Sequence, residues 1–196
     1  GRKGSIVAII KGTKSEIVME HLFKISRKLR LNVLEITLDM AGSMKLIAKR
    51  CFPNAVQVID RFHVQKLATE ALQEIRIGHR WEAIDLENEW IFENKLKDKP
   101  LPIEVFENGD TRKQLLARSR YLLYKSQEKW TESQQQRAQI LFENYPDIEK
   151  AYGLTNGLRQ IYNKRTVKDV AMLKLAHWFK DVENAGFKTF NTLVRT

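Results

Sequence analysis

The sequence predicts a mixed fold, with an α/β part over residues 1–76 followed by a nearly all-α part over residues 77–196. In the first part, three short β-branched runs alternate with helical patterns, which is typical of parallel strands joined by right-handed crossover helices. After about residue 76 the strand patterns stop, while apolar residues still recur at helical spacing. With 196 residues, the chain can form one sizeable domain or a domain with an insertion.

The first strand and helix are expected within residues 5–30. SIVAIIKG, residues 5–12, is β-branched, apolar and bounded by glycines, so it predicts a strand. Thr13 and Glu16 then stand at capping-box spacing, and apolar residues follow at helical intervals. An amphipathic helix is therefore expected over residues 14–30.

Two further strand–helix pairs follow. NVLEITLD, residues 32–39, is so continuously apolar that we expect a central strand buried on both faces. A short helix through Cys51 leads to a third strand, AVQVID, at residues 55–60. The apolar residues from Val64 to Ile75 then form a regular helical stripe.

The remaining residues predict helices separated by loops. Residues 78–95 fit a helix, and residues 97–110, with two prolines and a glycine, are the best loop candidate. Asp110 or Thr111 is expected to cap the next helix. Later helix boundaries are expected at Thr131, at Pro146 with an interruption near Gly153, at Thr166, at Gly186, and within residues 187–194.

Composition narrows the classes of protein. No apolar run approaches the roughly 18 residues that a membrane-spanning helix needs, and no signal-peptide pattern occurs. Gly1 opens the chain in mid-pattern without a methionine, and we expect it to be a cut end. Cys51 is the single cysteine, which excludes an internal disulfide and a cysteine-rich zinc site and fits a reducing cytosol.

The charge favours a polyanionic partner, with nucleic acid first. The net charge is +10 and the isoelectric point is about 9.7. Counting Lys and Arg against Asp and Glu gives +8 over residues 1–81, −6 over residues 82–110 and +8 over residues 111–196. Many soluble domains are basic without binding DNA, so charge alone leaves both possibilities open.

Two aspartates end neighbouring predicted strands. Asp39 closes the second strand, Asp60 closes the third, and His63 lies one helical turn beyond Asp60. Functional side chains of parallel α/β folds gather at the carboxyl ends of strands, where carboxylates can hold Mg²⁺ or Mn²⁺. Two such ions, about 3.5–4 Å apart, support phosphoryl transfer and need two or more carboxylates around one point. Each aspartate alone could also be a helix cap, and His63 could hydrogen-bond Asp60 or be a partly buried histidine.

Other chemistries find little support. The remaining histidines, His21, His79 and His177, show no zinc-type spacing, and no nucleophile elbow, Walker A loop or dinucleotide-binding glycine motif occurs. Cys51 lies on the apolar face of its helix, so a core position is expected. The tryptophans stand at helical spacing from other apolar residues and are expected in the core rather than as stacking platforms for bases: Trp81, Trp90, Trp130 and Trp178.

The stretch LDMAGSMKLIAKRCFPNAVQVIDRFHVQKLATEALQEIR carries FPNA, DRFHV and ALQEIR in series. This combination resembles the DDE transposases of bacterial insertion sequences, specifically the group with an FPNA…DRFH signature after the second catalytic aspartate. YPDIEKAYGLTNGLRQIYN, later in the chain, is similar to the helical section of that family. The resemblance covers most of the chain.

This resemblance implies a fold and a site. Residues 1–76 would be a partial RNase H-like catalytic core, and residues 77–196 a helical insertion domain that contacts transposon-end DNA or a second protomer. Asp39 matches the family's second catalytic aspartate, which is a metal ligand. Asp60 and His63 match an Asp/Cys-x-x-His signature, which implies a supporting role beside the site.

Departures from the family pattern predict a central fragment. The family's first catalytic aspartate would precede residues 5–12, and its catalytic glutamate lies in a motif that does not occur here. Glu183 precedes NAGFK, a context that does not match. We therefore expect the fragment alone to be inactive and to hold a divalent ion only weakly, whereas the intact enzyme would use Mg²⁺ or Mn²⁺ for DNA cleavage and strand transfer.

The candidate DNA contacts are basic residues of the helical part: Arg112, Lys113, Arg118 and Arg120. The resemblance implies transposon ends and target DNA as partners, a homodimer in the active complex, no membrane, and a place at the nucleoid in the bacterial cytoplasm. Two rival hypotheses remain open: a non-catalytic nucleic-acid-binding module, and an RNase H-like nuclease without strand transfer. An upstream strand that ends in aspartate and a downstream helix with a glutamate would support an enzyme over a binding module. Strand-transfer products of the full-length protein would separate a transposase from a plain nuclease.

Overall fold

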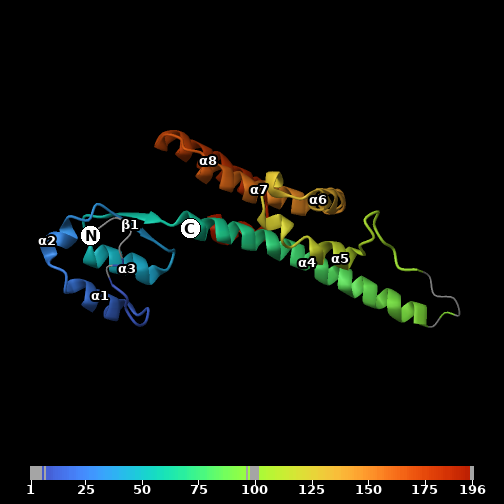
Figure 1. The fold of residues 1–196 in the computed structure, drawn as a ribbon, viewed down its shortest axis with the longest axis horizontal. Coiled ribbons are helices and arrows are strands. Elements are labelled where there is room, and N and C mark those ends of the chain that lie inside the picture. The colour runs from blue at the N-terminus through green and yellow to red at the C-terminus, as the bar shows by residue number, and fades with distance from the viewer. Residues whose placement is uncertain (1–5, 7, 96, 98–101, 195–196) are drawn as a thin grey trace. The chain divides into compact units, whose positions relative to one another are not determined.

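The computed structural model describes residues 6, 8–95, 97 and 102–194. Its contacts group the chain into two compact units, Gly1–Val64 and Gln65–Thr196 (Figure 1). The boundary falls inside a continuous helix, α4 (Arg61–Lys95). The division expected after residue 76 also lies within α4 and stays a prediction.

The first unit contains a parallel pair of short strands. β1 (Glu35–Leu38) pairs with β2 (Val56–Ile59) in a register that joins Leu38 to Ile59. α3 (Gly42–Cys51) connects the two strands and directs a buried face toward the interior of the unit. The expected α/β character, parallel pairing and crossover helix are thus confirmed for this part of the chain.

The expectation that β1 is buried on both faces is wrong. Glu35 and Thr37 are exposed, whereas Ile36 is half-buried and Leu38 is buried. Successive side chains of a strand point to opposite faces, so this alternation covers one face and leaves the other in water. The apolar residues that made the run look continuous, such as Leu34, lie before the strand begins.

The strand expected over residues 5–12 is not found in its described residues, Ile6 and 8–12, while Ser5 and Val7 lie outside the described part. The side chains of Ile6 and Ile9 are 79% and 89% exposed. A β-strand is stabilised by hydrogen bonds to a neighbouring strand. No such pairing involves these residues in the sheet that the structure describes.

The single helix expected over residues 14–30 is two helices, α1 (Ser15–Phe23) and α2 (Arg27–Leu31). Ser26 separates them, because its backbone lies at φ −53° and ψ 141°, outside the helical region. The capping box expected in TKSE does not form. Lys14 occupies the N-cap position, and Glu16 accepts its hydrogen bond from Ser15 Oγ at 2.9 Å instead.

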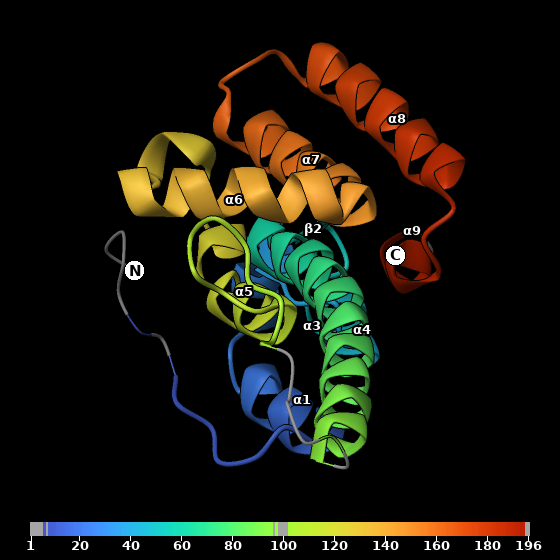
Figure 2. The same ribbon diagram turned by 90° about the vertical axis from the view of Figure 1, so that its right-hand side faces the viewer.

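Helices build the second unit. They are α4 from Gln65 onward, α5 (Arg112–Arg118), η1 (Leu122–Tyr124), η2 (Gln127–Lys129), α6 (Glu132–Asn144), α7 (Pro146–Asn163), α8 (Lys168–Ala185), η3 (Lys188–Phe190) and α9 (Asn191–Val194). Thr111 and Thr131 each form a complete capping box with the glutamine three residues later. In Figure 2, α6 lies against α7, and α7 lies against α8.

The interruption expected near Gly153 is wrong, because α7 is one continuous helix. A glycine inside a helix costs about 1 kcal/mol relative to alanine. Burying a side chain such as Ile148 or Leu158 on the same helix yields roughly 1.5–3 kcal/mol, so packing outweighs the glycine. Gly186, by contrast, ends α8 as expected, with φ +71° in the left-handed region that favours glycine.

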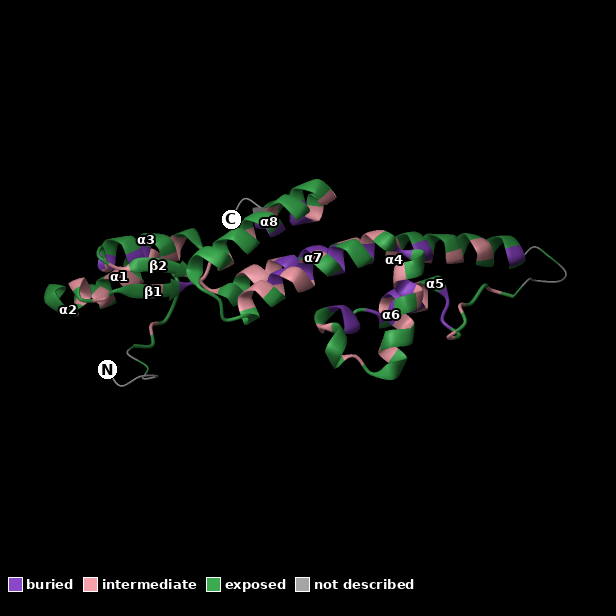
Figure 3. Ribbon diagram, turned by 90° about the horizontal axis from the view of Figure 1, so that it is seen from above, coloured by how far each residue is buried: buried purple, intermediate pink, exposed green. Residues whose placement is uncertain are grey.

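Buried leucines and aromatic residues form the core of the second unit. Figure 3 shows buried positions along α4, α5 and α7. Trp178 is buried, and Trp130 donates from Nε1 to the Leu122 carbonyl at 2.8 Å while its ring lies 5.4 Å from the ring of Tyr152. The expected core position is confirmed for Trp178, whereas Trp130 is half-buried. Trp81 departs from the expectation, because its side chain is 61% exposed.

Candidate functional site

Asp39 and Asp60 lie at the same edge of the β1–β2 pair, each directly after the carboxyl end of its strand. The parallel register joins Leu38 to Ile59, and each aspartate is the next residue of its strand. The backbone N–H of Asp60 also donates to the Leu38 carbonyl at 2.9 Å. Both aspartates are half-buried, so neither is sealed inside the apolar interior. The carboxyl edge of the pair therefore carries two acidic residues, as the strand pattern predicts.

Each carboxylate also fixes the turn that follows its strand. Asp39 Oδ1 accepts a hydrogen bond from the Ala41 N–H at 3.0 Å, just before α3. Asp60 Oδ1 accepts from the Phe62 N–H at 2.9 Å, which is an N-cap bond at the start of α4. The capping role and a metal-binding role are compatible, because a carboxylate has a second oxygen.

His63 is exposed at the start of α4. Its backbone N–H donates to the Asp60 carbonyl at 3.0 Å. No hydrogen bond joins its ring to another residue within the described ranges. The ring is therefore open to solvent beside the acidic edge, and His63 is neither a core histidine nor locked to Asp60.

An apolar pocket of about 390 Å³ borders Asp39. Its walls come from α1, β1 and α3, and include Leu22, Ile36 and Met44. Apolar walls reduce the screening of a neighbouring charge by water, so a cation at the Asp39 carboxylate would be attracted more strongly than at a fully solvated one.

The two aspartates fit a divalent ion in part. Their hard carboxylate oxygens suit Mg²⁺ or Mn²⁺, and Asp39 Oδ2 makes no hydrogen bond with any other described residue. However, the structure places no three His, Cys, Asp or Glu side chains together as a metal-holding group within residues 6, 8–95, 97 and 102–194. The edge thus supplies part of a ligand set.

Two of the candidate DNA contacts lie in ion pairs at the start of α5. Arg112 is 3.8 Å from Glu104, and both side chains are largely exposed. Lys113 pairs with Glu87 of α4, and the Glu87 side chain is mostly buried. An exposed pair is weak and can exchange its carboxylate for a phosphate, whereas the Lys113 pair is partly shielded from water.

The other two candidates differ from each other. Arg118 pairs with Asp110, whose side chain is fully buried. Arg120 is exposed, and its guanidinium lies 5.4 Å from the centre of the Tyr121 ring. Arg120 forms no ion pair with a carboxylate in the part of the chain that the structure describes. Of the four candidates, Arg120 is thus the one whose charge stays available.

The structure also reveals basic residues that the sequence interpretation did not single out. Arg76 and Arg80 stand four residues apart on α4, and Arg76 is buried with 4% exposure. The sequence held one signal for the burial of Arg76, because this residue continues the apolar stripe of Ala68 and Leu72 at helical spacing. An arginine on such a stripe is expected either to extend into water or to be buried for a reason.

His79 and Cys51 have structural roles. His79 Nε2 lies 2.6 Å from Asp147 Oδ2, and its Nδ1 lies 3.2 Å from Glu82, so the ring joins α4 to the start of α7. Cys51 is fully buried, and burial raises the pKa of its thiol. A raised pKa leaves less of the reactive thiolate. Because Cys51 is fully buried, its expected core position is confirmed.

A parallel strand pair with two aspartates at its carboxyl edge, followed in the chain by a helical unit, defines a mixed α/β and helical protein. A family model described as "Transposase", DDE_Tnp_ISL3, matches residues 1–196. The chain therefore belongs to this transposase family, and the expected family membership is confirmed. It matches no curated protein and no solved structure. Among the described helices, none is both long and apolar enough to cross a membrane.

Proposed function

We propose that the chain is the central part of a DDE transposase, which cuts DNA at the ends of an insertion sequence and joins the cut ends to target DNA. The observation that carries the proposal is the parallel register, which brings Asp39 and Asp60 out at one strand edge in a chain of a transposase family. Residues 1–76 would belong to an RNase H-like core. Residues 77–196 would be the helical insertion that binds transposon-end DNA and a second protomer.

Asp39 has the leading role in this proposal. A divalent ion held by Asp39 and by further carboxylates would activate a water molecule and stabilise the leaving oxygen of a phosphodiester. The hydrogen bond from Ala41 to Oδ1 orients the carboxylate and leaves Oδ2 for the ion. The apolar walls beside it limit competition from water.

Asp60 and His63 would support the site. Asp60 fixes the start of α4 through its bond to Phe62, and this holds the helix at the acidic edge. His63 presents an exposed ring one turn into the helix, where it can meet the DNA that approaches the edge. Neither residue needs to hold the ion directly in this arrangement.

Cleavage and strand-transfer assays on the full-length protein with Mg²⁺ test the proposal. Asp39→Asn keeps the oxygen that accepts from Ala41 but removes the negative charge. We expect both activities to fall about 100-fold or more, because several kcal/mol of charge stabilisation are lost, while the melting temperature stays the same. Asp181→Asn, at an exposed position of α8, is the matched control and should keep full activity.

Three outcomes separate the hypotheses. Cleavage by Asp39→Asn at the wild-type rate would remove the metal-ligand role. Cleavage without strand transfer by the wild type would identify a plain nuclease. Tight DNA binding with neither activity, in a full-length protein that lacks further carboxylates, would identify a binding module.

A further inference from the structure

Three arginines converge where α4 meets the turn after α5. Arg76 and Arg80 share one face of α4, and Arg120 lies in the turn between α5 and η1. Two hydrogen bonds join this turn and the preceding helix α5 to α4. Gln73 Nε2 donates to the Arg120 carbonyl at 3.2 Å, and Arg76 Nη1 donates to the Leu116 carbonyl at 2.8 Å. All these residues belong to the second unit.

Arg76 places a positive charge below the surface. Its Nε donates to Gln73 Oε1 at 2.7 Å, and both of its known hydrogen-bond acceptors are neutral oxygens. Burial lowers the pKa of its guanidinium, and the nearby charges of Arg80 and Arg120 lower that pKa further. Burying a charge without an opposite charge is costly, and two like charges nearby add to the cost.

Arg80 and Arg120 extend this charge toward the surface. Arg80 is half-buried, and its Nε is buried without a hydrogen-bond partner in the described chain. Neither Arg80 nor Arg120 pairs with a carboxylate among the described residues. This differs from Arg118 and Arg137 of the same unit, which both pair with Asp110.

We propose that Arg76, Arg80 and Arg120 form an anion site that takes a phosphate group of the nucleic-acid backbone. The guanidinium groups of Arg80 and Arg120 are the direct donors, since planar guanidinium forks match phosphate oxygens. Arg76 acts from behind them as a positioning charge. The identity of the ligand as DNA rests on the proposed function.

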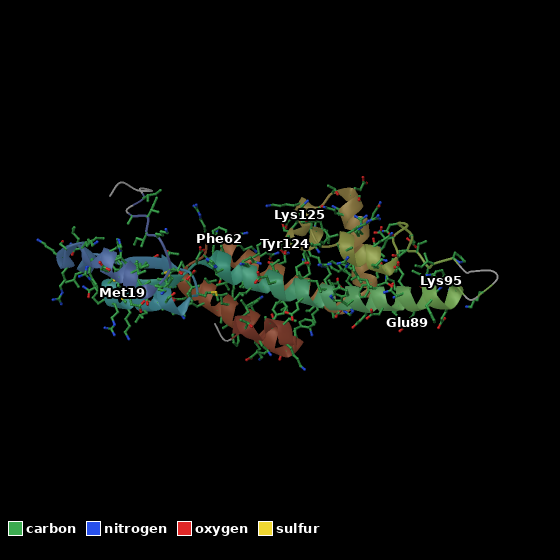
Figure 4. All side chains as sticks on the ribbon, turned by 90° about the horizontal axis from the view of Figure 1, so that it is seen from below. Met19, Phe62, Glu89, Lys95, Tyr124 and Lys125 are labelled. Atoms are coloured by element: carbon green, nitrogen blue, oxygen red, sulfur yellow. The ribbon has the colours of Figure 1, made fainter. Side chains whose placement is uncertain are left out.

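Aromatic rings favour nucleic acid over a free anion at this site. Tyr121 ends the turn and Tyr124 is the last residue of η1, and their side chains are 67% and 46% exposed. Figure 4 shows Tyr124 and Lys125 on the segment that lies beside the middle of α4. Exposed tyrosine rings next to unpaired arginines are suited to a base and its phosphate.

The first test is the melting temperature of the chain in inorganic phosphate, at constant ionic strength set with chloride. Phosphate should raise the melting temperature of the wild type, because a ligand that binds the folded state stabilises it. Arg80→Gln should melt at the wild-type temperature or higher without phosphate, since it relieves repulsion, and should lose the phosphate effect. Lys66→Gln removes a charge on the same helix that is already paired with Glu70, and it should keep the effect.

The second test is the salt dependence of binding to duplex DNA. Arg80→Gln should reduce the slope of log K against log salt by about 0.9, which means an affinity loss about threefold smaller between 50 and 200 mM salt. Lys66→Gln should leave the slope unchanged. A wild type that ignores phosphate, with an Arg80→Gln variant that melts early, would show a purely structural arginine and overturn the site. A phosphate effect with an unchanged DNA slope would overturn the nucleic-acid ligand.

Asp39→Asn distinguishes this inference from the proposed function. Asp39 belongs to the first unit, so this variant should bind DNA with the wild-type slope while it fails to cleave. Normal cleavage by Asp39→Asn together with a reduced slope for Arg80→Gln would remove the metal-ligand role of Asp39, on which the proposed function depends, and keep the anion site. Loss of cleavage by Asp39→Asn together with an unchanged slope for Arg80→Gln would overturn the anion site alone.

Discussion

Asp110 is a fully buried carboxylate that links three segments of the second unit. It pairs with Arg118 of α5 and with Arg137 of α6, whose Nε lies 3.1 Å from Oδ2. Asn108 also donates to Oδ2 at 3.1 Å, which closes the turn before α5. A buried carboxylate shared by two arginines and an amide is well compensated, whereas its partners would not be compensated without it.

Asp110→Ala should therefore destabilise the second unit by about 3–5 kcal/mol, since it leaves the partly buried Arg137 without its carboxylate. Urea unfolding followed by circular dichroism measures this change. Glu104→Ala removes the exposed partner of Arg112 and should cost at most about 1 kcal/mol. If the two variants lowered the free energy of unfolding equally, Asp110 would not be the residue that links these segments.

Tyr152 gives a prediction in pH. Burial raises the pKa of its phenol to about 12, and its hydroxyl donates to the Lys125 carbonyl at 2.8 Å. In the unfolded chain the phenol ionises near pH 10, so the unfolded state loses protons first. The contribution is fully present below pH 10 and is lost as the pH rises toward 12. Ultraviolet titration of the folded protein should show a phenolate step near pH 12 that is absent in Tyr152→Phe, and a Tyr152 step near pH 10 would contradict the burial effect.

The acidic edge was predictable from single residues, whereas the arginine cluster was not. Asp39 and Asp60 follow β-branched runs, and parallel pairing alone brings such residues to one edge. Arg120 joins Arg76 and Arg80 only because Gln73 bonds the Arg120 carbonyl, 47 residues away, and Arg76 bonds the Leu116 carbonyl of α5, 40 residues away. A contact at that separation leaves no trace in local periodicity.

At the scale of the element, two glycines provide a matched pair of tests. Gly153 lies inside α7, and a Cβ added there would meet nothing within 4 Å. Gly153→Ala should therefore stabilise the protein by about 0.5–1 kcal/mol, because it reduces the entropy of the unfolded chain and favours the helix. Gly186→Ala should destabilise it, because residue 186 has φ +71°.

Thermal unfolding of both glycine variants measures these shifts. A lower melting temperature for Gly153→Ala would mean that α7 is interrupted at this position, as the sequence suggested. An unchanged melting temperature for Gly186→Ala would mean that α8 does not need the left-handed residue to end.

Element boundaries were predictable where a local signal dominates. Thr131 and Gln134 specify a capping box through side-chain bonds to nearby backbone, and Pro146 fits a first turn, so α6 and α7 begin where expected. The break at Ser26 has no such local signal. The apolar spacing runs on from Leu22 through Leu29, while Ser26, the N-cap residue of α2, makes no side-chain capping bond.

At the scale of the whole molecule, the two units differ in how much apolar surface they bury. In the described part of the first unit, the buried apolar side chains are Leu38, Ile47, Ala48 and Cys51. The described part of the second unit buries more apolar side chains, among them Leu72, Leu115, Leu158, Trp178 and Phe190. A two-stranded sheet is marginal by itself and depends on helices for its stability.

Native-state hydrogen exchange should therefore divide the chain between the units. Amides of β1 and β2 should exchange through openings of lower free energy than amides in the middle of α7, because less apolar surface holds the strands in place. Ile47→Ala should raise exchange in β1 and β2 and leave α7 unchanged. Leu158→Ala, at a fully buried position of α7, should have the reverse effect. Each substitution should cost about 2–5 kcal/mol within its own unit. If either variant accelerated exchange equally in the strands and in α7, the chain would unfold as one cooperative body, and the two units would not be independent.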